Sequence, residues 1–435
     1  MEASINEKSK LRVFLRILAN IVWAVSLVII LVSCKSGEDS PAAPNSTNSS
    51  SISGGSSGVT NSGSIEGVAY MGGVSSTISG SLIITAHGGS SVVLTSEPIS
   101  VAVDPTGKFA YVANYGTNNV SAYTINAASG ALTLVTGSPF AAGTNPQSVA
   151  VDPTGKFVYV TNLNSSNVSA YTIDTSTGAL TPVTGSPFAT GYGPRSIAIE
   201  PSGKFAYTAN DGTNNVSAYT IDATTGALTP VVGSPFAAGS YPLSIAVDPT
   251  GKFAYVTNFQ SSNVSAYSID AATGTLTPVT GAPFTIGSYP RTIVVEPTGK
   301  FVYIAYSSGK VSAFTINATA GTLTEVTGSV FAAGSGGNTF YVAVDPKGKF
   351  LYVASYSANS VSAYAIDNTT GALTELAGSP FAAGTHPQSI TVDPTGKFAY
   401  VPNYHSNNVS VYSINANTGA LTEVAGSPFA TSTSP

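Results

Sequence analysis

Two arginines and two histidines are the residues of the long C-terminal region best suited to ligand chemistry. Arg195 and Arg291 are the only arginines after residue 97, and a guanidinium group binds carboxylate or phosphate through paired N–H donors. His386 and His405 could exchange a proton near neutral pH, although a loop histidine more often has no such role. These four residues can share one site only if the fold brings distant segments of the chain together.

A repeat of 48 residues, with one step of 49, orders this region. Its marker is an acidic residue followed by Pro, any residue, Gly and Lys. The marker begins at Asp104, Asp152, Glu200, Asp248, Glu296, Asp345 and Asp393. A period in the forties with several short strands in each unit is typical of a β-propeller.

The second unit shows how each repeat predicts four strands. Residues 148–151, 157–162 and 168–173 are short runs rich in β-branched and aromatic residues, and a fourth run begins at Leu180. Asp152-Pro-Thr-Gly between the first two runs has the composition of a type I turn. We therefore predict an all-β fold, a seven-bladed β-propeller over residues 98–435 with four antiparallel strands per blade.

Two positions vary from unit to unit, and both fall in loops on the same face of such a propeller. The position five residues before the marker includes Arg195 and Arg291, and the position eleven residues after it includes Asp211. The second position also holds the aromatic residues Tyr115, Phe259, Tyr356 and Tyr404. A constant scaffold with variable loops is typical of a binding surface, so we predict a central pocket for a small anion. Alternatively, each arginine forms a structural ion pair with a nearby carboxylate such as Glu200 or Glu296.

The N-terminus resembles a bacterial lipoprotein signal peptide. Basic residues lie between Lys8 and Arg16, residues 17–32 are apolar, and Leu31-Val32-Ser33-Cys34 resembles a lipobox. We expect residues 1–34 to be the signal peptide and Cys34 to carry the lipid, which would place the protein in the cell envelope. The membrane would be its partner through Cys34, on the periplasmic side of the outer membrane or at the cell surface. A signal anchor that stays in the membrane is the alternative.

Two segments separate the lipobox from the repeats. Residues 35–62 are rich in Ser, Gly and Asn and predict a disordered tether. Residues 63–97 contain two strand-like runs, and we expect them to pair near the last blade and to help close the ring.

Composition excludes several classes of function. Charged residues make up 9% of the chain and the net charge is −5, so nucleic acid is not an expected partner. One cysteine excludes an intrachain disulfide, and three scattered histidines do not predict a zinc site. The sequence has no phosphate-binding loop, dinucleotide fingerprint or nucleophile elbow. We expect a monomer without metal or cofactor.

The motif Tyr-Val-Thr-Asn at Tyr159 and Tyr255, with the Asp-Pro-x-Gly-Lys turn, resembles the YVTN-repeat, lactonase-like seven-bladed propellers. That family includes 6-phosphogluconolactonases and carboxymuconate-lactonizing enzymes. The resemblance implies a Gly-Pro-Arg-His segment followed by a strand ending in Asn-Glu. The third unit here carries Gly193-Pro194-Arg195-Ser196 and ends its next strand in Asn210-Asp211. Arg195 would bind an anionic group, whereas Ser196 cannot replace the proton exchange of a histidine.

The sequence leaves three functions open. The first is an exported, membrane-anchored propeller that binds a small anionic ligand or an envelope or surface protein on its variable face. The alternative is a lactonase that hydrolyses a sugar lactone, which the presence of Arg195 and Asp211 supports. A structural or adhesive surface protein is the third.

Overall fold

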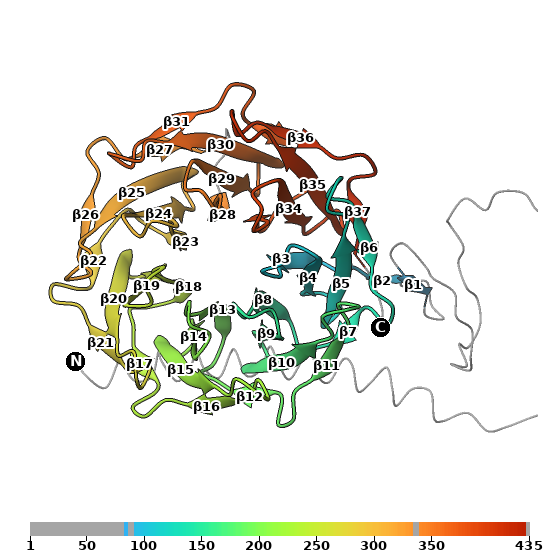
Figure 1. Ribbon diagram of the computed structural model, residues 1–435, viewed down its shortest axis with the longest axis horizontal. Helices are drawn as coiled ribbons and strands as arrows, with labels where there is room; N and C mark the ends of the chain where they lie inside the picture. Colours follow the sequence, from blue (N-terminus) through green and yellow to red (C-terminus); the bar gives the residue numbers. More distant parts are fainter. Residues whose placement is uncertain (1–81, 86–90, 334–338, 432–435) are drawn as a thin grey trace, which may run out of the picture. The chain divides into compact units, whose positions relative to one another are not determined.

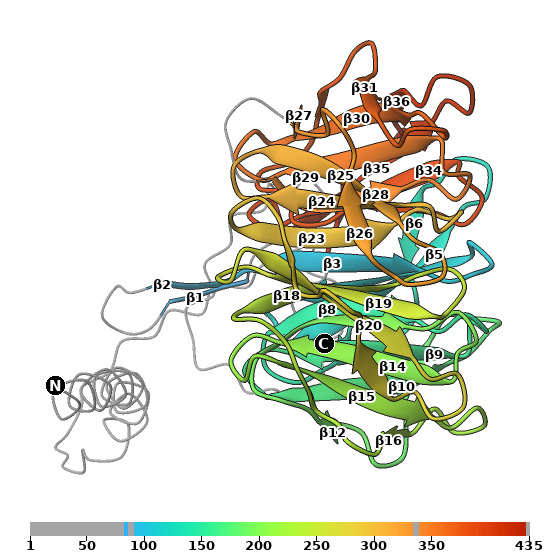
Figure 2. The same cartoon turned by 90° about the vertical axis from the view of Figure 1, so that its left-hand side faces the viewer.

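The computed structural model describes residues 82–85, 91–333 and 339–431, which lie in the second of two compact units, Ser64–Pro435. The predicted signal peptide with Cys34, the tether and residues 63–81 lie outside the described residues. Seven four-stranded antiparallel blades form a ring (Figure 1), which confirms the predicted fold. The innermost strands run along the axis of the ring (Figure 2). Among the described residues, no helix is long and apolar enough to cross a membrane.

Each blade uses five segments in chain order. The innermost strands are β3 (Pro98–Val103), β8 (Pro146–Val151), β13 (Pro194–Ile199), β18 (Pro242–Val247), β23 (Pro290–Val295), β28 (Thr339–Val344) and β33 (Thr391–Val392). The second strands are β4 (Phe109–Asn114), β9 (Phe157–Asn162), β14 (Phe205–Asn210), β19 (Phe253–Asn258), β24 (Phe301–Tyr306), β29 (Phe350–Ser355) and β34 (Phe398–Asn403). The third strands are β5 (Asn119–Ile125), β10 (Asn167–Ile173), β15 (Asn215–Ile221), β20 (Asn263–Ile269), β25 (Lys310–Ile316), β30 (Ser360–Ile366) and β35 (Asn408–Ile414).

The outermost strand of every blade is interrupted and consists of two short halves. The sequence predicted only the first half, as the run that begins at Leu180 in the second blade. Both halves pair with the third strand of the same blade. The first halves are β6 (Leu132–Leu134), β11 (Leu180–Pro182), β16 (Leu228–Pro230), β21 (Leu276–Pro278), β26 (Leu323–Glu325), β31 (Leu373–Glu375) and β36 (Leu421–Glu423). The second halves are β7 (Phe140–Ala141), β12 (Phe188–Ala189), β17 (Phe236–Ala237), β22 (Phe284–Thr285), β27 (Phe331–Ala332), β32 (Phe381–Ala382) and β37 (Phe429–Ala430).

The marker turn is held by its own acidic side chain. Asp152 is buried and accepts hydrogen bonds from the backbone N–H groups of Thr154 at 2.9 Å, Lys156 at 2.7 Å and Phe157 at 2.7 Å. Glu200 and Glu296 accept the corresponding backbone bonds in their own turns. The marker therefore encodes a capped turn that begins the second strand.

The second strands are buried on both faces because neighbouring blades pack against each other. Phe157 and Tyr159 of β9 pack on the next blade, in which Gly226 lies in the turn after the third strand. The Tyr159 hydroxyl donates a hydrogen bond to the Gly226 carbonyl at 2.9 Å. Gly226 has a φ of +75°, and a Cβ there would lie 2.4 Å from the Phe157 ring. Burial of one such aromatic side chain contributes about 1.5–3 kcal/mol.

The same Phe, Tyr and Gly contact recurs at all seven seams between blades, including the seam that closes the ring. There the Tyr400 hydroxyl of the last blade donates to the Gly130 carbonyl of the first, and Phe398 packs on Gly130. We call this contact the seam lock. Burial raises the pKa of Tyr400, with the carboxylate of Asp393 adding to the shift, so the phenol remains a donor.

Residues 95–97 add further contacts across the closing seam. The backbone N–H of Glu97 donates to Asn407 Oδ1 at 3.0 Å, and the hydroxyls of Ser96 and Thr431 are 2.5 Å apart. The preceding strands, β1 (Leu82–Thr85) and β2 (Ser91–Leu94), pair with each other and not with a blade. Each blade is thus built from one contiguous repeat unit, and the expected strand pairing with the last blade is not present in the described residues.

The innermost strand of the last blade, β33, has two residues where its counterparts have six. The cause lies in β34, where Pro402 occupies the position that Thr161 holds in β9. Proline has no N–H for the sheet, so regular pairing is lost there and only an isolated bridge joins Pro387 to Asn403.

Candidate functional site

A β-bulge places each of the two arginines. In the third blade, Pro194 pairs with Asn210 and Ser196 pairs with Ala209, so Arg195 is an extra residue in β13. The register shifts between Pro290 and Ile293 in the same way in the fifth blade, which includes Arg291. A bulge breaks the alternation of a strand and can redirect one side chain. Here it belongs to the variable position of the repeat and turns that position toward the axis of the ring.

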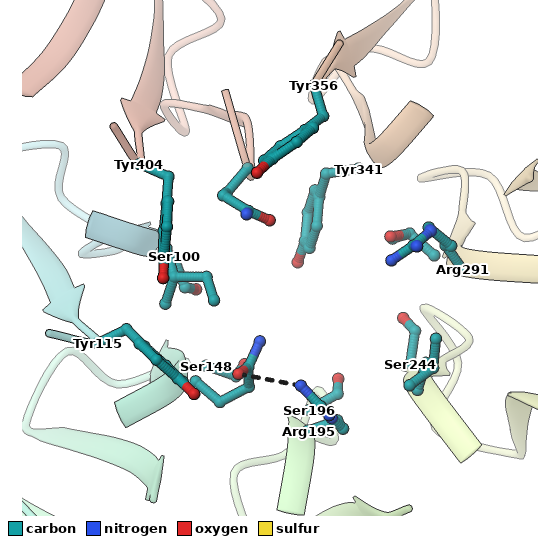
Figure 3. A pocket seen from close by; sticks show the side chains of 15 residues that line it. Ser100, Tyr115, Ser148, Arg195, Ser196, Ser244, Arg291, Tyr341, Tyr356 and Tyr404 are labelled. Carbon is teal, nitrogen blue, oxygen red and sulfur yellow. Dashed lines mark hydrogen bonds between the residues drawn. The ribbon is translucent and has the colours of Figure 1, made fainter. Parts of the chain in front are cut away.

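These side chains meet at one central cavity of about 310 Å³ (Figure 3). The cavity is lined by Ile99, Ser100, Tyr115, Gln147, Ser148, Arg195, Ser196, Leu243, Ser244, Arg291, Thr292, Tyr341, Tyr356, Gln388 and Tyr404. Blades three and five contribute the two arginines, and blades six, seven and one contribute the tyrosines. Figure 3 shows Tyr115 and Tyr404 on the side of the cavity opposite Arg291. The cavity therefore has a cationic half and a tyrosine half.

Arg195 is paired with the carboxylate that follows the next strand. Its Nε lies 2.6 Å from Oδ2 of the buried Asp211, and its Nη1 lies 3.4 Å from Gln147 Oε1. Glu200, the alternative partner considered from the sequence, is engaged by the backbone of its own turn and is not the partner of Arg195. Asp211 supports the cavity wall through Arg195 and does not itself line the cavity.

Arg291 lies on a polar and aromatic support. Its Nε donates to Ser307 Oγ at 2.8 Å, and its guanidinium carbon lies 5.4 Å from the centre of the Phe259 ring. Phe259 thus lies behind Arg291 and is not part of the lining. Burial, with the positive charge of Arg195 adding to it, lowers the pKa of Arg291 to about 10. The group therefore remains a cation at neutral pH.

The tyrosine half is fixed from outside the cavity. The Tyr404 hydroxyl donates to Glu97 Oε2 at 2.8 Å, and the rings of Tyr115 and Tyr404 are 6.3 Å apart. Burial, followed by the hydrogen bond and charge of Glu97, raises the pKa of Tyr404. Because its proton is committed to Glu97, the Tyr404 oxygen can accept a hydrogen bond from a ligand hydroxyl.

A ring of hydroxyl groups forms part of the lining, and Ser196 belongs to it. Its members stand four residues before the marker and are Ser100, Ser148, Ser196, Ser244 and Thr292. Ser196 Oγ accepts the backbone N–H of Ile245 in the next blade at 3.3 Å, and Ser100 Oγ accepts that of Val149 at 3.3 Å. Ser196 is therefore the ordinary residue of a position that joins neighbouring blades.

His386 and His405 lie beside the cavity and are not among its lining residues. The His386 ring stacks on Tyr356 with 4.0 Å between ring centres and an interplanar angle of 9°. The Nδ1 atoms of the two histidines are in direct contact. Burial, and then the neighbouring His405, lowers the pKa of His386. Within the described part of the chain, no group of three or more His, Cys, Asp or Glu side chains is placed to hold a metal ion.

The structure thus gathers Arg195, Arg291, Tyr115, Tyr356 and Tyr404 around one cavity. Sequence reasoning missed Tyr341, the hydroxyl ring and the role of Glu97. It also left Gln147 and Gln388 out of the candidate site, although they stand at the same repeat position as the arginines. That shared position was the available signal for the glutamines, whereas nothing in the sequence indicated that Glu97 contacts Tyr404.

A family model described as "Lactonase, 7-bladed beta-propeller" matches residues 82–189, 183–337 and 339–433. The chain belongs to this lactonase propeller family. No curated protein matches it.

Solved structures of several other proteins resemble this fold. One is a protein from Bacteroides uniformis provisionally named 6-phosphogluconolactonase, with 21% identity, a TM-score of 0.64, and coverage of 78% of this chain and 98% of that chain. Another is the periplasmic gluconolactonase of Pseudomonas aeruginosa, with 21% identity, a TM-score of 0.62, and coverage of 73% and 94%. The hydrazine synthase of Kuenenia stuttgartiensis is 23% identical over 74% of this chain and 97% of its own, with a TM-score of 0.58. At these identities the likeness concerns the fold.

Proposed function

We propose that this lactonase-family propeller binds a small organic anion in its central cavity, through Arg195 and Arg291. The observation that carries the proposal is the presence of two guanidinium groups on the wall of one cavity that is otherwise lined by hydroxyl, amide and apolar groups. Asp211 balances the charge of Arg195, and the lowered pKa of Arg291 reflects its burial and the nearby second cation. A carboxylate or phosphate between the two arginines could accept hydrogen bonds from both guanidinium groups.

The tyrosine half indicates the rest of the ligand. Tyr404 offers an oxygen lone pair, Tyr115 and Tyr356 offer ring faces, and the hydroxyl ring offers both donors and acceptors. A polyhydroxylated anion, such as a sugar acid or sugar phosphate, matches this set. The names of the neighbours from Bacteroides uniformis and Pseudomonas aeruginosa point to sugar lactones, which agrees with that class.

Hydrolysis of a sugar lactone is the second candidate, supported by family membership and by the Arg195–Asp211 pair. Among the described residues, however, the lining includes no histidine or carboxylate. Ser196 donates or accepts hydrogen bonds without exchanging protons at neutral pH. Asp211 is engaged by Arg195, so its use as a general base would require that pair to separate. Binding without rapid turnover therefore fits the cavity better.

Export and membrane anchoring through Cys34 belong to the same proposal and rest on the lipobox-like sequence. A lipid there would hold the propeller at the cell envelope, where it could meet either a solute or an envelope protein. Cys34→Ala is expected to move the protein from the membrane fraction to the soluble fraction and to abolish labelling by radioactive palmitate. Labelling that persists in the variant would contradict the anchor.

Titration calorimetry with 6-phosphogluconate, gluconate and inorganic phosphate tests the binding site. Arg291→Gln is expected to weaken binding about 10–100-fold, because a charge-assisted hydrogen bond contributes about 1.5–3 kcal/mol. Lys156→Gln is the matched control, since it removes one positive charge from an exposed marker turn on the opposite face. Equal effects of the two substitutions, or no binding of any of the three anions, would contradict the proposed site.

A lactone assay on the same proteins separates the two candidates. Hydrolysis of 6-phosphogluconolactone followed by acid release should be no faster than the uncatalysed reaction. Turnover by the wild type that Arg195→Ala abolishes would establish the lactonase and overturn the non-catalytic proposal.

A further inference from the structure

His386 and His405 come from two loops that the backbone joins independently of the imidazoles. His386 lies between β32 and β33, and His405 lies between β34 and β35. The Tyr404 N–H donates to the His386 carbonyl at 3.0 Å, and the His405 N–H donates to the Thr385 carbonyl at 3.3 Å. The Thr385 N–H in turn donates to Ser406 Oγ at 2.6 Å. These bonds hold the two histidines next to each other without a contribution from either imidazole.

The repeat confirms that this proximity is a property of the scaffold. In the second blade, the same two positions are held by Asn145 and Asn164, whose side chains form a hydrogen bond. Their loops are joined by equivalent backbone bonds, from Leu163 N to Asn145 O at 2.9 Å and from Asn164 N to Thr144 O at 3.2 Å. The last blade places imidazoles at both positions, which uses two of the three histidines in the chain.

The two imidazoles face each other with the same nitrogen. Their ring centres are 4.3 Å apart with an interplanar angle of 54°, and Nδ1 of one ring is directed at Nδ1 of the other. Two neutral rings can share only one hydrogen in this contact. When both rings carry their hydrogen on Nε2, two nitrogen lone pairs point to the same place, which is the donor arrangement of a metal chelate.

Aromatic neighbours fix the ring planes. Tyr356 stacks on His386, and the Tyr404 ring centre lies 5.0 Å from that of His405. Both tyrosines also line the central cavity. A chelating pair with restrained rings loses less conformational entropy on binding an ion, and an ion held there would lie next to the cavity wall.

We propose that His386 and His405 form a site for a divalent transition metal ion of the class of Cu²⁺, Ni²⁺ and Zn²⁺. Imidazole nitrogen suits these ions, whereas Mg²⁺ and Ca²⁺ prefer oxygen ligands. Two protein ligands leave the remaining coordination positions to water, so this is an open site of moderate affinity and not a closed structural one. Among the three ions, Cu²⁺ is expected to bind most tightly.

The decisive variant is the double substitution His386→Asn with His405→Asn, because it recreates the Asn145–Asn164 pair that the second blade already accommodates. The full chain and this variant are titrated with CuCl₂, ZnCl₂ and MgCl₂ in calorimetry. The wild type is expected to bind one more equivalent of Cu²⁺ and of Zn²⁺ than the variant, and neither protein to bind Mg²⁺ there. Cys34 and His87 are present in both proteins, so any binding by them cancels in the comparison.

A spectroscopic readout distinguishes the chelate from a structural effect. The electron paramagnetic resonance spectrum of the Cu²⁺-loaded wild type should show coupling to two imidazole nitrogens, and each single Asn substitution should remove one of them. Each single variant should also bind Cu²⁺ more weakly, by more than about tenfold, since a ligand matters more than the outer-shell partners whose loss costs 10–100-fold. Identical titrations for the wild type and the double variant, or a spectrum without nitrogen coupling, would overturn the site.

Discussion

Replacement of Gly226 by alanine tests the seam lock. Gly226 has a φ of +75°, and its added Cβ would lie 2.4 Å from Cδ1 of Phe157. Gly203 offers a matched control, because its φ is +74° while the nearest atom to an added Cβ, Pro153 Cδ, is 3.7 Å away. Both substitutions carry the cost of a left-handed backbone, about 1–2 kcal/mol. Only Gly226→Ala adds a clash inside the seam.

The size of the added cost follows from what surrounds Phe157. This ring is buried and packs in the cluster that joins the second and third blades, so it cannot move away without disturbing that cluster. Overpacking of this kind costs about 1–3 kcal/mol, and weakening of the Tyr159 to Gly226 hydrogen bond adds about 0.5–1.5 kcal/mol. Gly203→Ala is therefore expected to lower the free energy of unfolding by about 1–2 kcal/mol. Gly226→Ala should lower it by about 2.5–6.5 kcal/mol.

Urea unfolding of the full chain, followed by far-ultraviolet circular dichroism, measures both variants against the wild type. The comparison is valid when the slope of unfolding free energy against urea is unchanged, because a changed slope would report a different unfolding process. Equal losses of stability in the two variants would refute the reasoning, since the steric term would then contribute nothing and left-handed geometry alone would explain both.

Three further predictions concern the cavity and the seams. Asp211→Asn removes the carboxylate that balances the charge of Arg195. Loss of its repulsion toward a bound anion is worth about 1 kcal/mol, so affinity for 6-phosphogluconate should rise about fivefold in calorimetry. A lactonase that depends on Asp211 would instead lose turnover. Because the pKa of Arg291 is lowered to about 10, the arginine loses its proton as pH rises through that value. Anion affinity should stay level from about pH 7 to 9 and fall above about 10, and affinity that stays level throughout would exclude a dominant role for Arg291. Phe314 stands where the other six blades have a tyrosine that donates to a carbonyl of the preceding blade, as Tyr219 does to Ala189 at 2.7 Å. In urea unfolding, Phe314→Tyr should raise the free energy of unfolding by about 0.5–1.5 kcal/mol, and Tyr219→Phe should lower it by a similar amount. A destabilised Phe314→Tyr would show that the seam between the fourth and fifth blades has no room for the hydroxyl.

The repeat made the fold predictable because its information is local. A carboxylate that caps its own turn, as Asp152 does, needs no distant partner to begin the second strand. Seven such units with apolar residues on both strand faces can bury them only by packing blade on blade. The interruption of the outer strands and the shortening of β33 depended on pairing details, of which Pro402 was the one visible sign.

The candidate site was less predictable because its contacts cross between loops. The proximity of Glu200 in sequence suggested a partner for Arg195, but Glu200 is captured by backbone N–H groups of its own turn. The actual partner, Asp211, is reached only through the bulge in β13 and the register with β14. The contact of His386 with His405 likewise depends on backbone hydrogen bonds between two separate loops, which the sequence does not reveal.

The closing seam uses the same Tyr, Phe and Gly contact as the other six, and every blade is complete within one stretch of chain. The seventh and first blades form this contact without a covalent link, so the link between the sixth and seventh blades is not what holds those two blades together. The termini could be moved to any junction by circular permutation with the same set of interfaces retained. The architecture also suits growth by tandem gene duplication, since each added repeat carries both the Phe and Tyr of the contact and the Gly that accepts it.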